Sequence, residues 1–210
     1  MTRTLLFDLG NVLLFFDHGK ALRALASYLN PLTAMYIWAR KNEFLKELRG
    51  EADLLESGRM DLAQFYSRLK GKIGLTIEFT QFQAIWNDIF TPNEPVLALA
   101  QTLATRYPCY ILSNTNASHL EYVRATYPQL SFARGYAASH ELGVMKPSRE
   151  FFDKALQQFG LQPLDAVFID DLAENVSGAR EAGLDSFQYQ TPEQLQQELA
   201  ARGIVVAASV

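Results

Sequence analysis

Short apolar runs alternate with apolar positions at helical spacing along most of this chain. Continuous apolar runs between turn signals are typical of strands that are covered on both faces of a sheet. Such runs occupy residues 3–7, 109–112, 132–138, 166–169 and 186–189. Between the later runs, apolar residues recur three and four positions apart, as on the buried face of a helix; Phe152, Ala155, Leu156 and Phe159 are one example. This alternation predicts an α/β fold, with a doubly wound, mostly parallel sheet and helices on both of its faces.

Residues 18–90 differ from the rest of the chain because their pattern predicts helices and no convincing strand. One helix face in this segment carries Leu62, Phe65, Tyr66, Leu69 and Ile73. The residues that follow, Thr-Pro-Asn-Glu-Pro at 91–95, are typical of a compact turn and a helix start. We therefore expect a small helical bundle at residues 18–90, inserted after the first strand into a core made of residues 1–17 and 91–210.

Several aromatic and basic side chains of this insertion are candidates for contact with a ligand. They are Tyr36, Trp38, Arg40, Phe44 and Arg49. Aromatic residues at helical spacing belong more often to a core than to a binding site, so this set also has an ordinary structural explanation.

The composition narrows the class of protein. With 210 residues, 49% of them hydrophobic and 20% charged, the chain is typical of a globular protein with one core and room for a modest inserted domain. The net charge of −4 argues against nucleic acid as a main partner. We find neither a basic leader nor an apolar stretch approaching ~20 residues, so we expect no membrane partner and a cytoplasmic location. The single cysteine, Cys109, lies in an apolar run and is expected to be a buried, inert thiol.

Polar side chains stand where three of the predicted strands end. These side chains are Asp8, Ser113, Asn114, Asp170 and Asp171. A further polar residue, Lys146, comes directly before Pro147 at the start of a predicted helix. Parallel strands place all their carboxyl ends at one edge of the sheet, which is where ligands bind in such folds. We therefore expect these groups to meet if the strands are neighbours.

Carboxylates, a lysine and a hydroxyl at one sheet edge suit the binding of a phosphoryl group. Three acids in a small site repel one another unless a cation neutralises them, and Mg²⁺ takes hard oxygen ligands from carboxylates. Lys146 would neutralise phosphate charge from the other side, while Ser113 and the amide of Asn114 would donate hydrogen bonds to phosphoryl oxygens. In-line attack by Asp8 would then give an aspartyl-phosphate. Each feature alone also fits a helix cap or a solvated lysine, and only the combination favours this function.

The same residues give the chain a family resemblance. It resembles the haloacid dehalogenase-like hydrolase superfamily, and within it the sugar-phosphate phosphatases that have a helical cap. The matching segments are residues 7–13 with Asp8 at the nucleophile position, 112–114 with Ser113 as a phosphate-binding hydroxyl, 143–147 with Lys146 as the phosphate-clamping lysine, and 168–171 with the metal-binding acids, followed by Glu174 and Asn175. The resemblance implies a Rossmann-like core, a small phosphorylated substrate, Mg²⁺ as cofactor, and a cap at residues 18–90 that selects the substrate.

Residue 10 departs from the family's usual first motif. Most phosphatases that the chain resembles have a second aspartate two residues after the nucleophile, which serves as a general acid. Here that residue is Gly10, whose carbonyl is expected to bind the metal together with Asp8, Asp170 and Asp171, but which has no side chain to move protons. General acid–base catalysis is worth about 10²–10⁴ in rate. A good leaving group, such as the anomeric oxygen of a hexose 1-phosphate, would reduce that need.

Gly10 is compatible with three more hypotheses. Asp17, His18 or another residue of the insertion would serve as a substitute proton donor. A 2-haloacid dehalogenase needs no proton for its halide leaving group, although Asp170 and Asp171 would then form a metal site without a purpose. A non-catalytic domain that binds a phosphoryl ligand would need no general acid at all.

Overall fold

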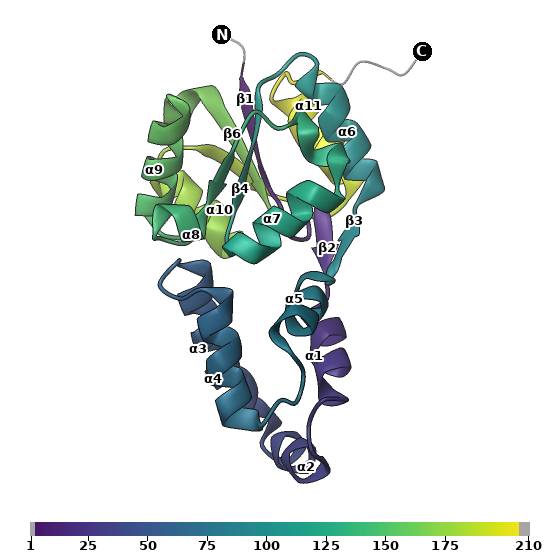
Figure 1. Ribbon diagram of the computed structural model, residues 1–210. Helices are drawn as coiled ribbons and strands as arrows, with labels where there is room; N and C mark the ends of the chain where they lie inside the picture. Colours follow the sequence, from purple (N-terminus) through teal and green to yellow (C-terminus); the bar gives the residue numbers. More distant parts are fainter. Residues whose placement is uncertain (1–2, 206–210) are drawn as a thin grey trace.

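A sheet of five parallel strands lies at the centre of the computed structural model, which describes residues 3–205 except for the side chains of Trp38, Lys41 and Leu45 (Figure 1). The strands, in their order across the sheet, are β5 (Tyr136–Ala138), β4 (Cys109–Ser113), β1 (Thr4–Asp8), β6 (Ala166–Asp170) and β7 (Asp185–Gln188). Asp8 pairs with Leu112 on one side of β1, and Phe7 pairs with Ile169 on the other. The register therefore brings the carboxyl ends of β4, β1 and β6 to the same edge.

Helices cover both faces of this sheet, because side chains of β1 alternate between two cores. Leu5 and Phe7 face a core shared with α6 (Glu94–Ala104), α7 (Ala117–Thr126) and α11 (Pro192–Ala201). Leu6 faces the opposite core, formed with α9 (Arg149–Phe159) and α10 (Ala173–Glu181). The predicted doubly wound α/β architecture is confirmed.

A group of helices extends beyond the carboxyl edge of the sheet (Figure 1). Its members are α1 (His18–Ala26), α2 (Pro31–Ala39), α3 (Lys41–Glu56), α4 (Leu62–Ile73) and α5 (Phe79–Asn87). They share a core of their own, in which Phe65, Phe82 and Trp86 contact one another through their rings. We call residues 18–90 the helical insertion; that it forms a separate cap domain with these boundaries stays a prediction.

Two short elements differ from the sequence-based expectation. Residues 90–92 form β3 (Phe90–Pro92), which pairs in an antiparallel ribbon with β2 (Leu14–Phe16), where the sequence predicted only a turn. The strand expected at residues 132–138 is confined to Tyr136–Ala138, because a 3-10 helix at Pro128–Phe132 occupies the preceding residues. Phe132 reaches the core from that turn and packs edge-on against Phe7, so its apolar character does not mark a strand.

The helical insertion contacts the core at two places. At the turn after α3, the Ser139 hydroxyl of α8 (Ser139–Leu142) donates to the main-chain carbonyl of Glu56 at 2.6 Å. Gly58 in the same turn has a φ of 70°, and a Cβ there would lie 2.2 Å from the carbonyl oxygen of His140. At α5, the carbonyl of Trp86 lies 3.0 Å from Nε2 of His119 in α7. The insertion is therefore docked over the carboxyl edge of the sheet.

Two further expectations concern single features of the chain. Cys109 is buried at the start of β4, where burial raises the pKa of its thiol to about 12. Between residues 3 and 205, we find no helix with both the length and the apolar character needed to cross a membrane.

Gly178 of α10 packs so closely against the main chain of Pro147 that there is no space for an added methyl group. A Cβ at this position of α10 would lie 2.1 Å from the carbonyl oxygen of Pro147, whereas a Cβ at Gly71 of α4 would meet nothing within 4 Å. We expect Gly178→Ala to lower the free energy of unfolding by about 1–3 kcal/mol through overpacking. The matched variant Gly71→Ala should raise it by roughly 0.5–1 kcal/mol through helix propensity. Urea unfolding of both variants checks this, and equal effects would contradict the close contact.

Candidate active site

Three side chains that end neighbouring strands converge at the carboxyl edge of the sheet. Asp8 ends β1, Ser113 ends β4 and Asp170 ends β6, and all three are buried. The loop between α8 and α9 brings Lys146 to the same point, where its side chain is also buried. The structure thus brings together groups that lie more than a hundred residues apart in the chain, as the sequence predicted.

The ammonium group of Lys146 lies between two buried carboxylates. Its Nζ is 2.6 Å from Oδ1 of Asp8, 2.7 Å from Oδ2 of Asp170 and 3.1 Å from the carbonyl oxygen of Leu112. These contacts employ all three donors of the ammonium. Burial alone would lower the pKa of Lys146, but the two carboxylates raise it above its usual range. The lysine is therefore a fixed positive charge at the centre of the site.

The same environment acts on the nucleophile candidate in the opposite direction. Burial raises the pKa of Asp8 to about 7, although Lys146 lowers it; the charges of Asp170 and Asp171 add to the rise. Only Oδ1 of Asp8 is held by the lysine. Within residues 3–205, we find no hydrogen bond to its Oδ2. Lys146 thus fixes the orientation of the Asp8 carboxylate through Oδ1 and leaves Oδ2 free to contact a ligand.

The side chain of Asn114 positions Lys146. Its Oδ1 accepts from the main-chain N–H of Lys146 at 2.8 Å, and its Nδ2 donates to the carbonyl of the same residue at 2.9 Å. One N–H of the side-chain amide is thus engaged with Lys146, and the donation from the amide of Asn114 to phosphoryl oxygens stays a prediction. The Ser113 hydroxyl stays available to bind a ligand, because among the described residues it makes only a 3.4 Å contact with the carbonyl of Asn114.

Two asparagines orient the remaining acids. Nδ2 of Asn175 donates to both oxygens of Asp170, at 3.0 and 3.1 Å, and the N–H of Leu172 donates to Oδ1 at 2.9 Å. Nδ2 of Asn11 donates to Oδ2 of Asp171 at 3.1 Å. Burial raises the pKa of Asp171, while this hydrogen bond lowers it. Sequence reasoning missed the role of Asn11; its signal was the Gly-Asn turn, where Asn11 adopts a φ of 54°.

The three acids are close enough to share one cation. Asp8, Asp170 and Asp171 each offer a carboxylate oxygen, and these oxygens lie within 4.8 Å of one another. Carboxylate oxygens are hard ligands of the kind that Mg²⁺ and Ca²⁺ prefer. Gly10 lines a cavity together with Asp8 and Asp171.

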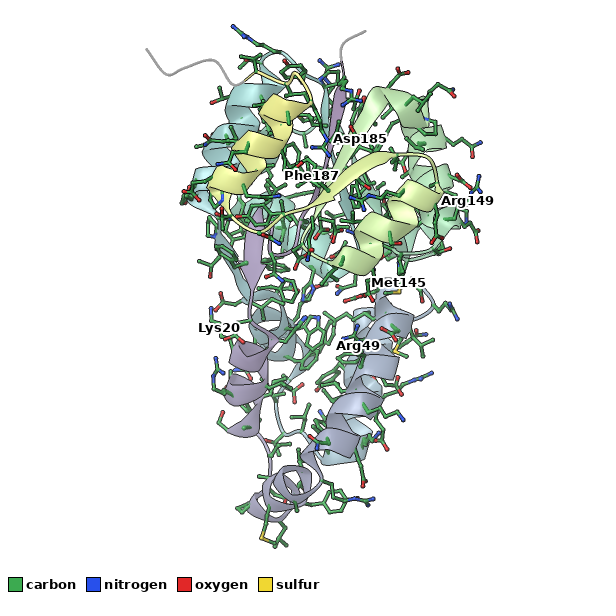
Figure 2. All side chains as sticks on the ribbon, turned by 180° about the vertical axis from the view of Figure 1, so that it is seen from behind. Lys20, Arg49, Met145, Arg149, Asp185 and Phe187 are labelled. Carbon is green, nitrogen blue, oxygen red and sulfur yellow. The ribbon has the colours of Figure 1, made fainter. Side chains whose placement is uncertain are left out.

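A cavity of about 610 Å³ separates this cluster from the helical insertion. Arg49 and Glu56 of α3 line it from the insertion, and Met145 lines it from the core; Figure 2 shows Arg49 and Met145 on the two sides of the boundary. Burial and the charge of Asp53 raise the pKa of Glu56 to about 7, against the effects of Arg49 and Lys146.

The candidates predicted from the sequence differ in whether they line this cavity. Of the five in the insertion, Arg49 lines it, Tyr36, Arg40 and Phe44 do not, and the side chain of Trp38 lies outside the described residues. The two candidates for a substitute proton donor also differ. Asp17 is exposed and paired with Arg23 at 2.7 Å, away from the cavity, whereas His18 lines it.

Comparisons with known proteins find similar proteins over most of the chain. A family model described as haloacid dehalogenase-like hydrolase matches residues 2–183. A D-ribitol-5-phosphate phosphatase of Bacteroides thetaiotaomicron is 27% identical over 95% of this chain and 97% of its own. A flavin mononucleotide hydrolase of Arabidopsis thaliana is 34% identical over 31% of this chain and 26% of its own. A haloacid dehalogenase family enzyme of B. thetaiotaomicron, crystallised with magnesium and inorganic phosphate, is 25% identical with a TM-score of 0.76, covering 90% of this chain and 95% of its own.

Removing the central cation tests the electrostatic arrangement. Lys146→Met leaves Asp8 and Asp170 buried without a counter-charge, and breaking such a pair costs about 3–5 kcal/mol. Without the ammonium, the folded protein holds protons that the unfolded chain releases above the ordinary pKa of 3.8. The wild type holds the Asp8 proton up to a pKa of about 7, and loss of the ammonium raises that pKa further. The deficit relative to wild type should therefore grow as the pH rises from about 7 to about 9.

Urea unfolding at both pH values measures this effect. Lys20→Met, which breaks an exposed pair with Asp88, is the control and should cost less than about 1 kcal/mol at either pH. A Lys146→Met deficit as small as the control, or one that shrinks as the pH rises, would contradict the arrangement.

Proposed function

The chain belongs to the haloacid dehalogenase-like hydrolase family, and from this we propose that it is a Mg²⁺-dependent phosphatase that hydrolyses a small phosphorylated metabolite through an aspartyl-phosphate on Asp8. The observation that carries the proposal is the buried ammonium of Lys146 between Asp8 and Asp170, beside a cavity large enough for a substrate. The similarity to the D-ribitol-5-phosphate phosphatase of B. thetaiotaomicron and to the enzyme crystallised with magnesium and inorganic phosphate supports the same chemistry.

The donor set fits a magnesium ion. Three carboxylates within 4.8 Å carry more negative charge than Lys146 alone neutralises, and oxygen-only ligands favour a hard cation. We propose that Asp8, Asp170 and Asp171 hold the ion, together with the main-chain carbonyl of Gly10. When bound, Mg²⁺ polarises the phosphoryl group and neutralises charge that develops on its oxygens.

Asp8 is proposed to act as the nucleophile. Its Oδ2 attacks phosphorus in line, so that an O–P bond to Asp8 forms while the bond to the substrate's alcohol oxygen breaks. Lys146 lowers the pKa of Asp8 against the effect of burial and orients its carboxylate through Oδ1, and with the Ser113 hydroxyl it stabilises the non-bridging phosphoryl oxygens. Water then attacks phosphorus, which releases phosphate and restores the carboxylate. Asn114 serves this step indirectly, because it fixes the main chain of Lys146.

The proposed substrates are sugar or polyol phosphates. Gly10 has no side chain that could donate a proton to the leaving alcohol of the substrate. A hexose 1-phosphate would therefore suit the site, because its leaving group is the anomeric oxygen of the sugar. Among the residues that line the cavity, His18 and Glu56 carry side chains able to move a proton to other alcohols. The absence of a proton donor at Gly10 is also compatible with dehalogenation, in which Asp8 would attack carbon and halide would leave without needing a proton.

Loss of the nucleophile tests the proposal. We expect Asp8→Asn to lower the hydrolysis of 4-nitrophenyl phosphate by about 10³-fold or more while the far-ultraviolet circular dichroism stays unchanged. Asp153→Asn is the matched control, because Asp153 is exposed on α9 and does not line the cavity, and it should keep full activity. Chelation of divalent cations should abolish hydrolysis, and Mg²⁺ should restore it.

Three outcomes would contradict the proposal. Undiminished hydrolysis by Asp8→Asn would exclude Asp8 as nucleophile. Release of halide from a 2-haloacid that is insensitive to a chelator would favour the dehalogenase. Binding of phosphate esters without turnover of any of them would favour a non-catalytic domain.

A further inference from the structure

Aromatic side chains form one side of the cavity, next to the proposed nucleophile. We define the aromatic wall as Phe16 of β2, His18 at the start of α1 and Trp86 of α5, all of which line the cavity. The ring centroids of Phe16 and His18 are 5.0 Å apart, and those of His18 and Trp86 are 6.4 Å apart. The Phe16 side chain is 38% exposed, although it is large and apolar. Within this wall, Phe16 presents exposed ring surface, whereas Trp86 is only 7% exposed because Phe65, Phe82 and His119 pack against it.

Gly10 allows Phe16 to lie this close to the reacting groups. A Cβ built on Gly10 would be 2.8 Å from Cε1 of Phe16 and 3.9 Å from Oδ2 of Asp8. The Phe16 ring and the proposed attacking oxygen therefore flank the same point. A side chain at residue 10 would force the Phe16 ring to move. The absence of an aspartate at residue 10 therefore allows the aromatic ring to lie beside Asp8.

The side of the cavity that α3 forms is mixed, because Leu48, Ala52 and Leu55 line it together with three charged residues. Arg49, Asp53 and Glu56 line it from α3, and such groups suit hydrogen bonds to hydroxyls. His18 does not add a second phosphate-binding charge, because burial lowers its pKa, and Arg49 lowers it further against the effect of Asp17. Its ring is tilted by 57° from that of Phe16, so the two rings present separate faces. The cavity therefore has a phosphate end, charged groups on α3 and the ring of Phe16 on the side of β2.

We propose that the substrate is a phosphate ester whose alcohol carries a flat aromatic ring, as flavin mononucleotide and nucleoside 5-phosphates do, and that this ring packs on Phe16. The proposal rests on the proposed phosphatase function and narrows its substrate class. A ring-free sugar phosphate would leave the aromatic wall uncovered, whereas ring packing removes apolar surface from water and adds aromatic contacts. A cavity of about 610 Å³ lies within the roughly 300–1,000 Å³ that enclose ligands of this size.

Pairs of esters that share a leaving group test this inference. Flavin mononucleotide and D-ribitol 5-phosphate differ by the flavin ring, and adenosine 5-monophosphate and D-ribose 5-phosphate differ by the base. All four lose a primary alcohol, so leaving-group chemistry does not separate them. Binding is measured by calorimetry with the Asp8→Asn variant in the presence of Mg²⁺, which reports affinity without turnover. The values of kcat/KM are measured with the wild type.

We expect the ring-bearing member of at least one pair to bind about tenfold more tightly than its ring-free partner, and to have a similarly higher kcat/KM. Adding Phe16→Ala should remove roughly fivefold to tenfold of that preference and change the ring-free affinities less than about twofold. Phe15→Ala is the matched control, because Phe15 is also exposed on β2 but does not line the cavity, and it should leave every affinity unchanged. The preferred pair identifies the ring as flavin or nucleobase.

Equal affinities within both pairs, an equal loss for all four esters in Phe16→Ala, or no binding of any ester would overturn the inference. Failure of the proposed function is recognised separately. Ring-dependent binding to Asp8→Asn without hydrolysis of any ester by the wild type would disprove the phosphatase and leave the ring-binding wall supported.

Discussion

A single buried ammonium group, that of Lys146, joins the carboxylates that end two neighbouring strands. Burial of Asp8 and Asp170 without a counter-charge would cost several kcal/mol, so the edge of the sheet depends on this lysine. The lysine in turn depends on Asn114, which holds its main chain with two hydrogen bonds. Gly178 allows α10 to pack directly against the carbonyl of Pro147, the next residue. The parallel register of β1 with β4 and β6 makes the whole arrangement possible, because it aligns the strand ends.

The sequence predicted this convergence because the rule behind it is simple. Asp8, Ser113 and Asp170 each follow an apolar run, and parallel strands end at one edge. The pairings within the site were not predictable in the same way. Nothing in the local pattern marks that Asn11 bonds to a residue 160 positions away, or that Asn114 is engaged by Lys146. The ribbon β2–β3 was missed because each strand has only three residues and β3 ends in a proline that is typical of a turn.

Gly10 illustrates a second limit of sequence reasoning. From the sequence, this residue is only the place where a proton donor is lacking. In the structure, it is also the place where the Phe16 ring approaches Asp8. Phe16 and Trp86 are far apart in the chain and line the same cavity because the β2–β3 ribbon pairs Phe16 with Phe90 and α1 packs against α5. Of the four candidates in the insertion whose side chains the structure describes, only Arg49 is found among the cavity residues, since helical spacing alone does not tell which face of a helix meets a ligand.

The covalent state of Asp8 during turnover is the sharpest test of the proposed mechanism. The protein is mixed with Mg²⁺ and an excess of a phosphate ester that it hydrolyses, quenched in acid within one turnover, and digested for mass spectrometry. Nucleophilic attack by Asp8 predicts a phosphoryl adduct on the peptide that contains this residue, and no adduct in the Asp8→Asn variant or when a chelator is present. Release of phosphate in the first turnover with no adduct on Asp8, or with the adduct on another residue, would contradict the mechanism.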